Sequence, residues 1–203
     1  KASRISGPTA VEGVPTPVGF APVYIRGGSV IPMLSSSSSA SSASSASSAA
    51  SASVSVTASP FPALELLVAL DHAESGGANG TLFVDDGVSV LSPASPSQSG
   101  EQPSPWSCVV EMHVADRLLT VTKSKTGCSL PQSLAWAPPV VTDVSILGVS
   151  IGITEMVLTQ LGDSPKTRVL PRTDYQWDGA TQVLRVSNLQ QNATEDFSLA
   201  WTI

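Results

Sequence analysis

Two neighbouring aspartates, Asp85 and Asp86, have the residue type and closeness that carboxylate chemistry requires. Hydrolysis of a glycosidic bond uses two carboxyl groups, which flank the bond that breaks. Neighbouring side chains on a strand, however, point to opposite faces, and Gly87 follows the pair directly. Because an Asp-Asp-Gly run is typical of a turn, we interpret both residues as turn residues. We assign no catalytic residue in this chain.

Metal and cofactor sites have no support in the sequence. The two histidines, His72 and His113, lie far apart and belong to no motif with the spacing of metal ligands. The glycine pairs at 27–28 and 76–77 lack the spacing and the following helix of a phosphate-binding loop. We therefore expect glycines that form turns, a structural His113, no metal and no cofactor.

Two of the four tryptophans are candidates for stacking on sugar rings. Trp136 and Trp177 lie beside proline or Asp-Gly segments, where an aromatic side chain can stay exposed. Trp201 lies in an apolar segment and is expected to be buried. Packing in the core is the alternative for Trp136 and Trp177 as well.

Two segments match the acceptor pattern for N-glycosylation, at Asn79 and at Asn192. The pattern matters only if the chain enters the secretory pathway. Asn79 also precedes a glycine, and an Asn-Gly pair is a strong signal for a tight turn. We prefer the turn for Asn79 and keep the glycan as the alternative.

Cys108 and Cys128 are the only cysteines, so the chain permits a single disulfide. Such bonds persist in oxidising compartments. Two buried free thiols are an equally good interpretation, because free cysteine behaves as a small apolar residue.

The composition excludes several classes of protein. Hydrophobic residues make up 41% of the 203 residues, which is enough to form a core. The net charge of −6 and the lack of a basic stripe argue against nucleic acid as a partner. The longest apolar run, near residues 66–70, is far below the length of a membrane span, so we expect no membrane contact. The chain begins at Lys1 without a signal-peptide pattern and resembles a fragment.

Short β-branched and aromatic runs between turn residues predict an all-β chain without a helix longer than three turns. Residues 64–70 and 81–84 suggest one hairpin, and residues 106–114 and 117–123 suggest another around Ala115-Asp116. The remaining predicted strands are residues 22–26, 29–33, 140–147, 151–158, 183–186 and 197–201. The first two of these flank a tight turn at Gly27-Gly28.

Residues 35–59 consist almost entirely of serine and alanine, with no large apolar side chain before Val54. Such a segment cannot offset the entropy of ordering itself, so we predict a disordered linker. An O-glycosylated stalk is one interpretation, and a low-complexity expansion in a surface loop is the one that we prefer.

Several segments together resemble the part of family 31 glycoside hydrolases that follows the catalytic barrel. The first is APVYIRGGSVIPM at residues 21–33, and the second combines LLVALD at 66–71 with GTLFVDDG at 80–87. VSILGV at 144–149 and residues 197–203 resemble later strands in the lysosomal and intestinal α-glucosidase branch. The chain departs from the family at Val88, where a glutamate is common, and in the long connection over residues 34–60.

The resemblance implies an antiparallel β-sandwich, with a remnant of a smaller proximal sandwich at residues 1–34, the linker at 35–59 and a distal sandwich of seven to nine strands at 60–203. It implies a non-catalytic part of an α-glucosidase that acts on terminal α-linked glucose with retention. The partner would be the enzyme's own (β/α)₈ barrel, which carries the catalytic aspartates upstream, so the chain alone is expected to be inactive. The resemblance also favours the secretory pathway, a lysosome or vacuole, or the extracellular space.

The alternative is a stand-alone carbohydrate-binding β-sandwich, which would bind α-glucan or an oligosaccharide through Trp136 or Trp177. Such a module needs no barrel. It should fold alone and lose affinity when either tryptophan is removed, whereas a supporting region should bind no glycan.

Overall fold

Every regular element in the described part of the chain is a β-strand, as the alternating sequence patterns predict. The computed structural model describes residues 24–35, 63–71, 76–85, 107–129 and 138–203, without the side chains of 125–129. The predicted linker therefore lies outside the described residues, apart from Ser35. The twelve strands are β1 (Ser29–Leu34), β2 (Leu64–Ala69), β3 (Ala78–Asp85), β4 (Ser107–Ala115), β5 (Leu118–Ser129), β6 (Val140–Leu147), β7 (Glu155–Gln160), β8 (Lys166–Val169), β9 (Tyr175–Asp178), β10 (Val183–Val186), β11 (Gln191–Asn192) and β12 (Phe197–Thr202).

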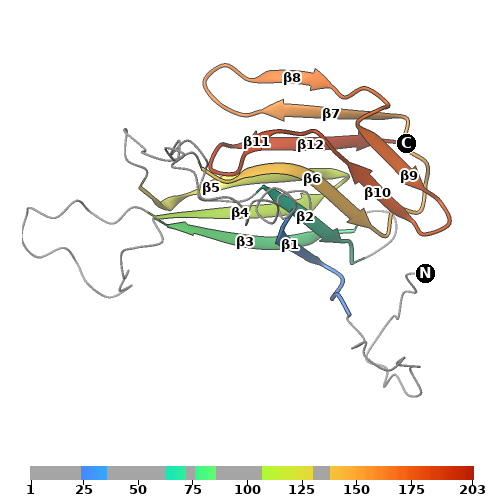
Figure 1. The fold of residues 1–203 in the computed structure, drawn as a ribbon, viewed down its shortest axis with the longest axis horizontal. Helices are drawn as coiled ribbons and strands as arrows, with labels where there is room; N and C mark the ends of the chain where they lie inside the picture. Colours follow the sequence, from blue (N-terminus) through green and yellow to red (C-terminus); the bar gives the residue numbers. More distant parts are fainter. Residues whose placement is uncertain (1–23, 36–62, 72–75, 86–106, 130–137) are drawn as a thin grey trace, which may run out of the picture.

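The strands form one curled sheet in the order β8-β7-β12-β5-β4-β3-β1-β2-β6-β10-β9, with the short β11 paired to β6 (Figure 1). Most neighbours are antiparallel, but β1 pairs with β3 and β2 pairs with β6 in parallel. Two parallel neighbours cannot be joined by a tight turn and need a longer connection. In both pairs, at least one other strand lies between the two partners along the chain. The fold is thus an all-β, sandwich-like domain built from a mixed sheet.

The core lies inside the curl, where every second side chain of the long strands is buried. In β4 the buried positions are Cys108, Val110, Met112 and Val114, and they alternate with more exposed neighbours. The largest side chains with almost no exposure come from both halves of the curl: Phe197, Leu66, Leu119, Ile146, Met156, Leu184, Leu189 and Leu199. One continuous apolar core therefore joins the strands of the N-terminal and C-terminal segments.

The hairpin of β4 and β5 confirms the hairpin predicted around Ala115-Asp116, but the turn lies one residue later, at Asp116-Arg117. Asp116 and Arg117 have φ angles of 49° and 64°, so two consecutive residues adopt the left-handed conformation. A two-residue turn of this kind matches the twist of the flanking strands. The strand predictions over 64–70, 140–147, 183–186 and 197–201 are also confirmed, within a residue at either end.

The predicted hairpin of residues 64–70 with 81–84 is wrong. Both segments are strands, but β1 lies between them and pairs with each. Residues 24–26 also lack the predicted strand conformation, although the turn at Gly27-Gly28 and the strand after it are confirmed. The turn requires glycine at its second position, because Gly28 has a φ of 82°.

The tight turn predicted at Asn79-Gly80 is also wrong, because both residues lie within β3. Glycine at position 80 has a different cause. A Cβ atom there would lie 2.1 Å from the carbonyl oxygen of Val30, so β3 passes β1 too closely for any side chain.

The second half contains more strands than the sequence predicts. β8, β9 and β11 were not expected, and the strand predicted at 151–158 begins only at Glu155. The division at residues 34 and 60 stays a prediction. Within the described residues, β1 belongs to the same sheet as the strands that follow residue 60.

Candidate functional site: the outer face of the sheet

Side chains on the outside of the curl form two surfaces of different chemistry, and the first is apolar. In β1 and β3 the residues next to buried positions point outward, and they include Ile31 at 38% exposure and Phe83 at 54%. The strand register sets Ile31 opposite Leu67 of β2, and Phe83 opposite Val109 of β4. We call Ile31, Leu67, Phe83 and Val109 the apolar outer face. Exposed apolar residues gathered on one side of a sheet are candidates for an interaction surface.

The second surface is a polar groove over β2, β6, β10 and β9, with a volume of about 650 Å³. This volume is typical of sites for small ligands. The strand register places Gln176 of β9 opposite Arg185 of β10, and Arg185 opposite Ser145 of β6. Ser145 in turn donates a hydrogen bond to Glu65 of β2, at 2.7 Å. A continuous polar row therefore crosses the groove floor.

The loop between β10 and β11 forms a wall of this groove. Asn188 and Gln190 line the groove and adopt φ angles of 58° and 53°. A left-handed conformation costs a non-glycine residue about 1 kcal/mol, so the surrounding structure must enforce it. Leu189, between them, is buried in the core and donates its backbone N–H to the Thr142 carbonyl at 3.0 Å. The anchored leucine thus fixes the backbone positions from which the two amide side chains extend.

Two carboxylates lie at neighbouring register positions in the groove, Glu65 on β2 and Asp143 on β6. Each accepts a hydrogen bond from an adjacent hydroxyl: Ser145 donates to Glu65, and Thr142 donates to Asp143 at 2.6 Å. These two carboxylates, with the Arg185 guanidinium and the amides of Gln176, Asn188 and Gln190, provide both donors and acceptors. The arrangement is suited to binding a ligand that has hydroxyl groups.

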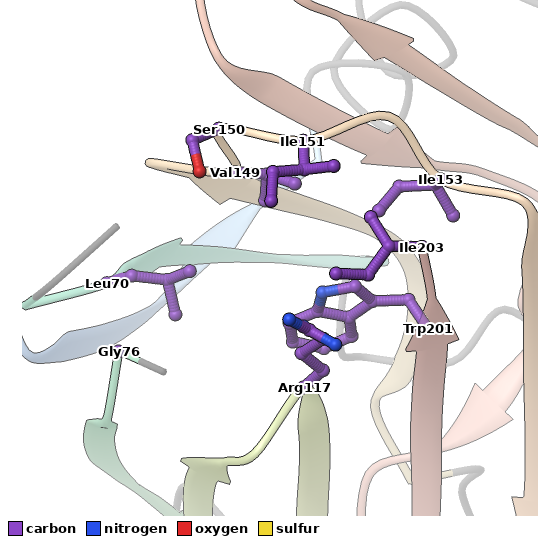
Figure 2. Close-up of a pocket in the computed structure, with 9 residues that line it drawn as sticks. All are labelled: Leu70, Gly76, Arg117, Val149, Ser150, Ile151, Ile153, Trp201 and Ile203. Atoms are coloured by element: carbon purple, nitrogen blue, oxygen red, sulfur yellow. The ribbon is translucent and has the colours of Figure 1, made fainter. Parts of the chain in front are cut away.

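A second hollow is small and apolar. It has a volume of about 20 Å³, and its walls include Leu70, Ile153, Trp201 and Ile203 (Figure 2). Figure 2 shows Leu70 on one side and Trp201 and Ile203 on the other. Such a volume holds about one water molecule. The hollow is therefore too small for a sugar ring.

Trp177 lies in β9, outside the polar groove, and is partly buried against the core. Its indole N–H donates to the Val149 carbonyl at 3.0 Å. A Cβ atom at Gly179 would lie 2.7 Å from the indole ring, and one at Gly152 would lie 3.4 Å away. The indole thus packs against two glycines. Trp201 is buried, as predicted, while stacking on sugars by Trp177 stays a prediction and Trp136 lies outside the described residues.

The turn after β9 carries a carboxylate with a perturbed pKa. Asp178 accepts hydrogen bonds from the Thr181 hydroxyl at 2.6 Å and the Ala180 backbone N–H at 2.9 Å. These hydrogen bonds, the Thr181 bond first, and the charge of Arg185 lower the pKa of Asp178 below 3.8. The hydrogen bonds within the turn thus account for most of the lowering of this pKa, and Arg185 contributes least.

The remaining candidates from the sequence are spread over the sheet. Asp85 ends β3, and Asp86 lies outside the described residues together with His72. His113 is exposed on β4, where its Nδ1 lies 2.6 Å from the Asn79 Oδ1. Within the described ranges, no group of three histidine, cysteine, aspartate or glutamate residues is placed to hold a metal ion. The same residues contain no helix long and apolar enough to cross a membrane.

The two acceptor asparagines differ in their surroundings. Asn79 is exposed at the second position of β3. Asn192 lies in β11, and its Oδ1 accepts hydrogen bonds from both the backbone N–H and the hydroxyl of Thr194, each at 2.8 Å. Glycosylation at either site stays a prediction.

The cysteines lie on neighbouring strands. The register sets Cys108 of β4 directly opposite Cys128 of β5. Cys108 is completely buried and disulfide-bonded, and Cys128 is the only other cysteine of the chain. These observations favour the disulfide over two free thiols, the interpretations that the sequence left open.

Comparisons with known proteins identify the fold. No protein family and no curated protein matches the chain. A crystal structure of the glucosidase II alpha subunit in an alpha3-Glc2-bound form matches 88% of this chain and 17% of its own, with a TM-score of 0.50 and 13% identity. A structure of the ER glucosidase II complex, consisting of the catalytic subunit and the binding domain of the regulatory subunit, matches the same shares, with a TM-score of 0.49 and 13% identity. The described fold thus resembles a region that makes up a small part of a larger glucosidase subunit.

Proposed function

We propose that the chain is the C-terminal, non-catalytic β-sandwich region of a family 31 glycoside hydrolase of the α-glucosidase type. The fold similarity to part of the glucosidase II alpha subunit carries this proposal. The match includes 88% of this chain but only 17% of the glucosidase subunit, so the proposed enzyme contains much more than this region.

The sequence blocks that resemble the family lie side by side in the structure. The segment 21–33 contributes all of β1 except Leu34, and the segments 66–71 and 80–87 contribute most of β2 and all but the first two residues of β3. These are the sequence blocks that resemble the family. In the structure β1 pairs with both β2 and β3, so the two blocks form a single three-stranded unit.

In this proposal the apolar outer face packs against the catalytic (β/α)₈ barrel. Ile31 and Phe83 remain substantially exposed in the chain by itself. Removing such side chains from water stabilises an interface by roughly 25 cal/mol per Å² of apolar surface. The region would hold the barrel in place, and hydrolysis of terminal α-linked glucose would take place on barrel residues.

The compartment proposed is oxidising, in the secretory pathway, a lysosome or vacuole, or outside the cell. A disulfide at Cys108 fits this location, because such bonds are rare where thiols are kept reduced.

Two experiments test the proposed function. The coding sequence upstream of Lys1 should contain, in frame, a barrel whose strands carry the family's catalytic aspartates. An in-frame stop or an unrelated domain there would refute the proposal. The purified 203-residue chain, with folding checked by circular dichroism, should not hydrolyse maltose or a chromogenic α-glucoside. Turnover by the folded chain would overturn the supporting role.

A further inference from the structure

We infer that the polar groove over β2, β6, β10 and β9 is a binding site for a neutral linear oligosaccharide. This inference goes beyond the supporting role proposed above and does not depend on it. It replaces the expectation that a supporting region binds no glycan, because none of the four residues of the apolar outer face lines the groove. The groove is the largest of the hollows described above, and no part of the supporting role uses it.

The first argument is the unused hydrogen-bonding capacity of the groove. Among the described residues, none donates to or accepts from the side-chain amides of Gln176, Asn188 and Gln190. The Arg185 guanidinium also makes no hydrogen bond in this part of the chain. Each of these side chains is exposed, so binding a ligand would replace bonds to water with bonds to hydroxyl groups.

The second argument is the chemistry of the lining. Two carboxylates against one guanidinium leave the groove with a slight negative charge, which disfavours phosphates and acidic peptides. The apolar side chains in the lining, Tyr175 and Val186, are both buried, so a lipid or an aromatic compound finds no apolar contact. Hydroxyl groups both donate and accept, and they match a lining of carboxylates, amides and a guanidinium.

The third argument is preorganisation. Leu189 fixes the loop by its buried side chain and by its backbone bond to Thr142. Ser187 adds a backbone hydrogen bond to the Asp174 carbonyl at 2.8 Å. The backbone of Asn188 and Gln190 therefore keeps its position without ligand, which reduces the entropy cost of binding. The strain at these two residues is also of the kind that gathers at binding sites.

The dimensions favour an oligomer over a single sugar. The polar row from Glu65 to Gln176 crosses four neighbouring strands. Three strand spacings give a floor about 14 Å wide. We expect a trisaccharide to bind more tightly than glucose, with a dissociation constant on the order of 1 mM, because the groove offers no exposed aromatic ring for stacking.

The test is an NMR titration of the ¹⁵N-labelled chain with maltotriose, cellotriose and glucose. Saturable shifts of the side-chain amides of Gln176, Asn188 and Gln190 are expected with at least one trisaccharide, and weaker binding with glucose. No saturable shift with either trisaccharide would overturn the inference. Shifts confined to the Trp177 indole would also overturn it, because they would move the site to β9's other face.

Matched variants locate the site. Gln190→Gly removes a groove amide and relieves the left-handed strain, so the fold is retained. Gln182→Gly is the control. It also removes an amide and relieves a left-handed conformation, with a φ of 54°, but Gln182 does not line the groove. Arg185→Met is compared in the same way with Arg168→Met on the exposed strand β8.

We expect binding at least about tenfold weaker for Gln190→Gly and Arg185→Met, and unchanged binding for both controls. Equal binding by all four folded variants would refute the assignment to this groove. Failure of this titration leaves the proposed glucosidase role intact, because that role is tested by the upstream coding sequence and by the activity assay.

Discussion

The two halves of the outer face share one sheet but differ in chemistry. On β1, β2 and β3 the outward positions carry Ile31, Leu67 and Phe83, whereas on β6, β10 and β9 they carry Ser145, Arg185 and Gln176. The two halves meet where Leu67 lies opposite Ser145. Both halves have similarly buried inner positions, so the core cannot explain the difference. Outward side chains are not constrained by packing in the core, so their chemistry can reflect function. We assign protein contact to the half with β1, β2 and β3, and saccharide binding to the half with β6, β10 and β9.

The largest predicted effect separates a core phenylalanine from an outer one. Phe197→Ala should lower the free energy of unfolding by about 3–5 kcal/mol, because Phe197 is only 1% exposed in the core. Phe83→Ala should change it by no more than about 0.5 kcal/mol in the isolated chain, since Phe83 lies outside. Urea denaturation measures both. Equal losses would mean that Phe83 serves the fold and not a partner.

The second prediction concerns the cysteines behind the apolar outer face. Reduction of the bond between Cys108 and Cys128 should lower the free energy of unfolding by about 2–4 kcal/mol, because the bond restricts the unfolded chain. Thiol titration of the unreduced, unfolded chain should find no free thiol, and Cys108→Ser should release one. Two free thiols in the unreduced chain would refute the bridge.

The third prediction tests the apolar half itself. The double variant Ile31→Ser with Phe83→Ser should bind less hydrophobic dye and self-associate less than the wild type, because it removes the exposed apolar surface. Val169→Ser on β8 is the control, since Val169 is 57% exposed but lies outside this face. Dye fluorescence and sedimentation measure the two effects. An equal change in the control would show that no particular apolar patch exists.

The smallest predicted effect is at the edge of the polar half. The fold lowers the pKa of Asp178, so the stabilisation that its carboxylate provides is complete above the unfolded value of 3.8. It is lost as the pH falls through the lower folded value. Asp178→Asn should therefore lower the melting temperature at neutral pH, and the difference should shrink well below pH 3.8. A difference that grows with acid would contradict the lowered pKa.

Local patterns in the sequence predict the strands better than their partners. Alternation identifies β4, β5, β6, β10 and β12, and the turn beside Asp116 joins β4 and β5 in the predicted hairpin that the structure confirms. The position of β1 between β2 and β3 depends on a parallel pairing, which no local turn encodes. The error at Asn79-Gly80 has the same origin, because glycine is needed at position 80 where β1 passes too close for a side chain.

The groove was missed for a related reason. Glu65, Ser145, Arg185 and Gln176 come from four strands and look like ordinary outward positions when each strand is considered alone. The left-handed residues of its wall are not glycines, and only Asn188 is of a type that favours this conformation, so the sequence gives a weak signal for them. The tryptophans suggested a sugar site on a β-sandwich, but the groove that the structure presents contains neither Trp136 nor Trp177 in its described lining.

The central claim is that this chain is a supporting region of a larger α-glucosidase. An antibody raised against the 203-residue chain can precipitate the native protein from its source, and the precipitate can be assayed with maltose and a chromogenic α-glucoside. We predict that the precipitate contains α-glucosidase activity, and that the antibody recognises a polypeptide much larger than 20.8 kDa. A precipitate that holds only the 20.8 kDa chain, with all the activity left in the supernatant, would contradict the account.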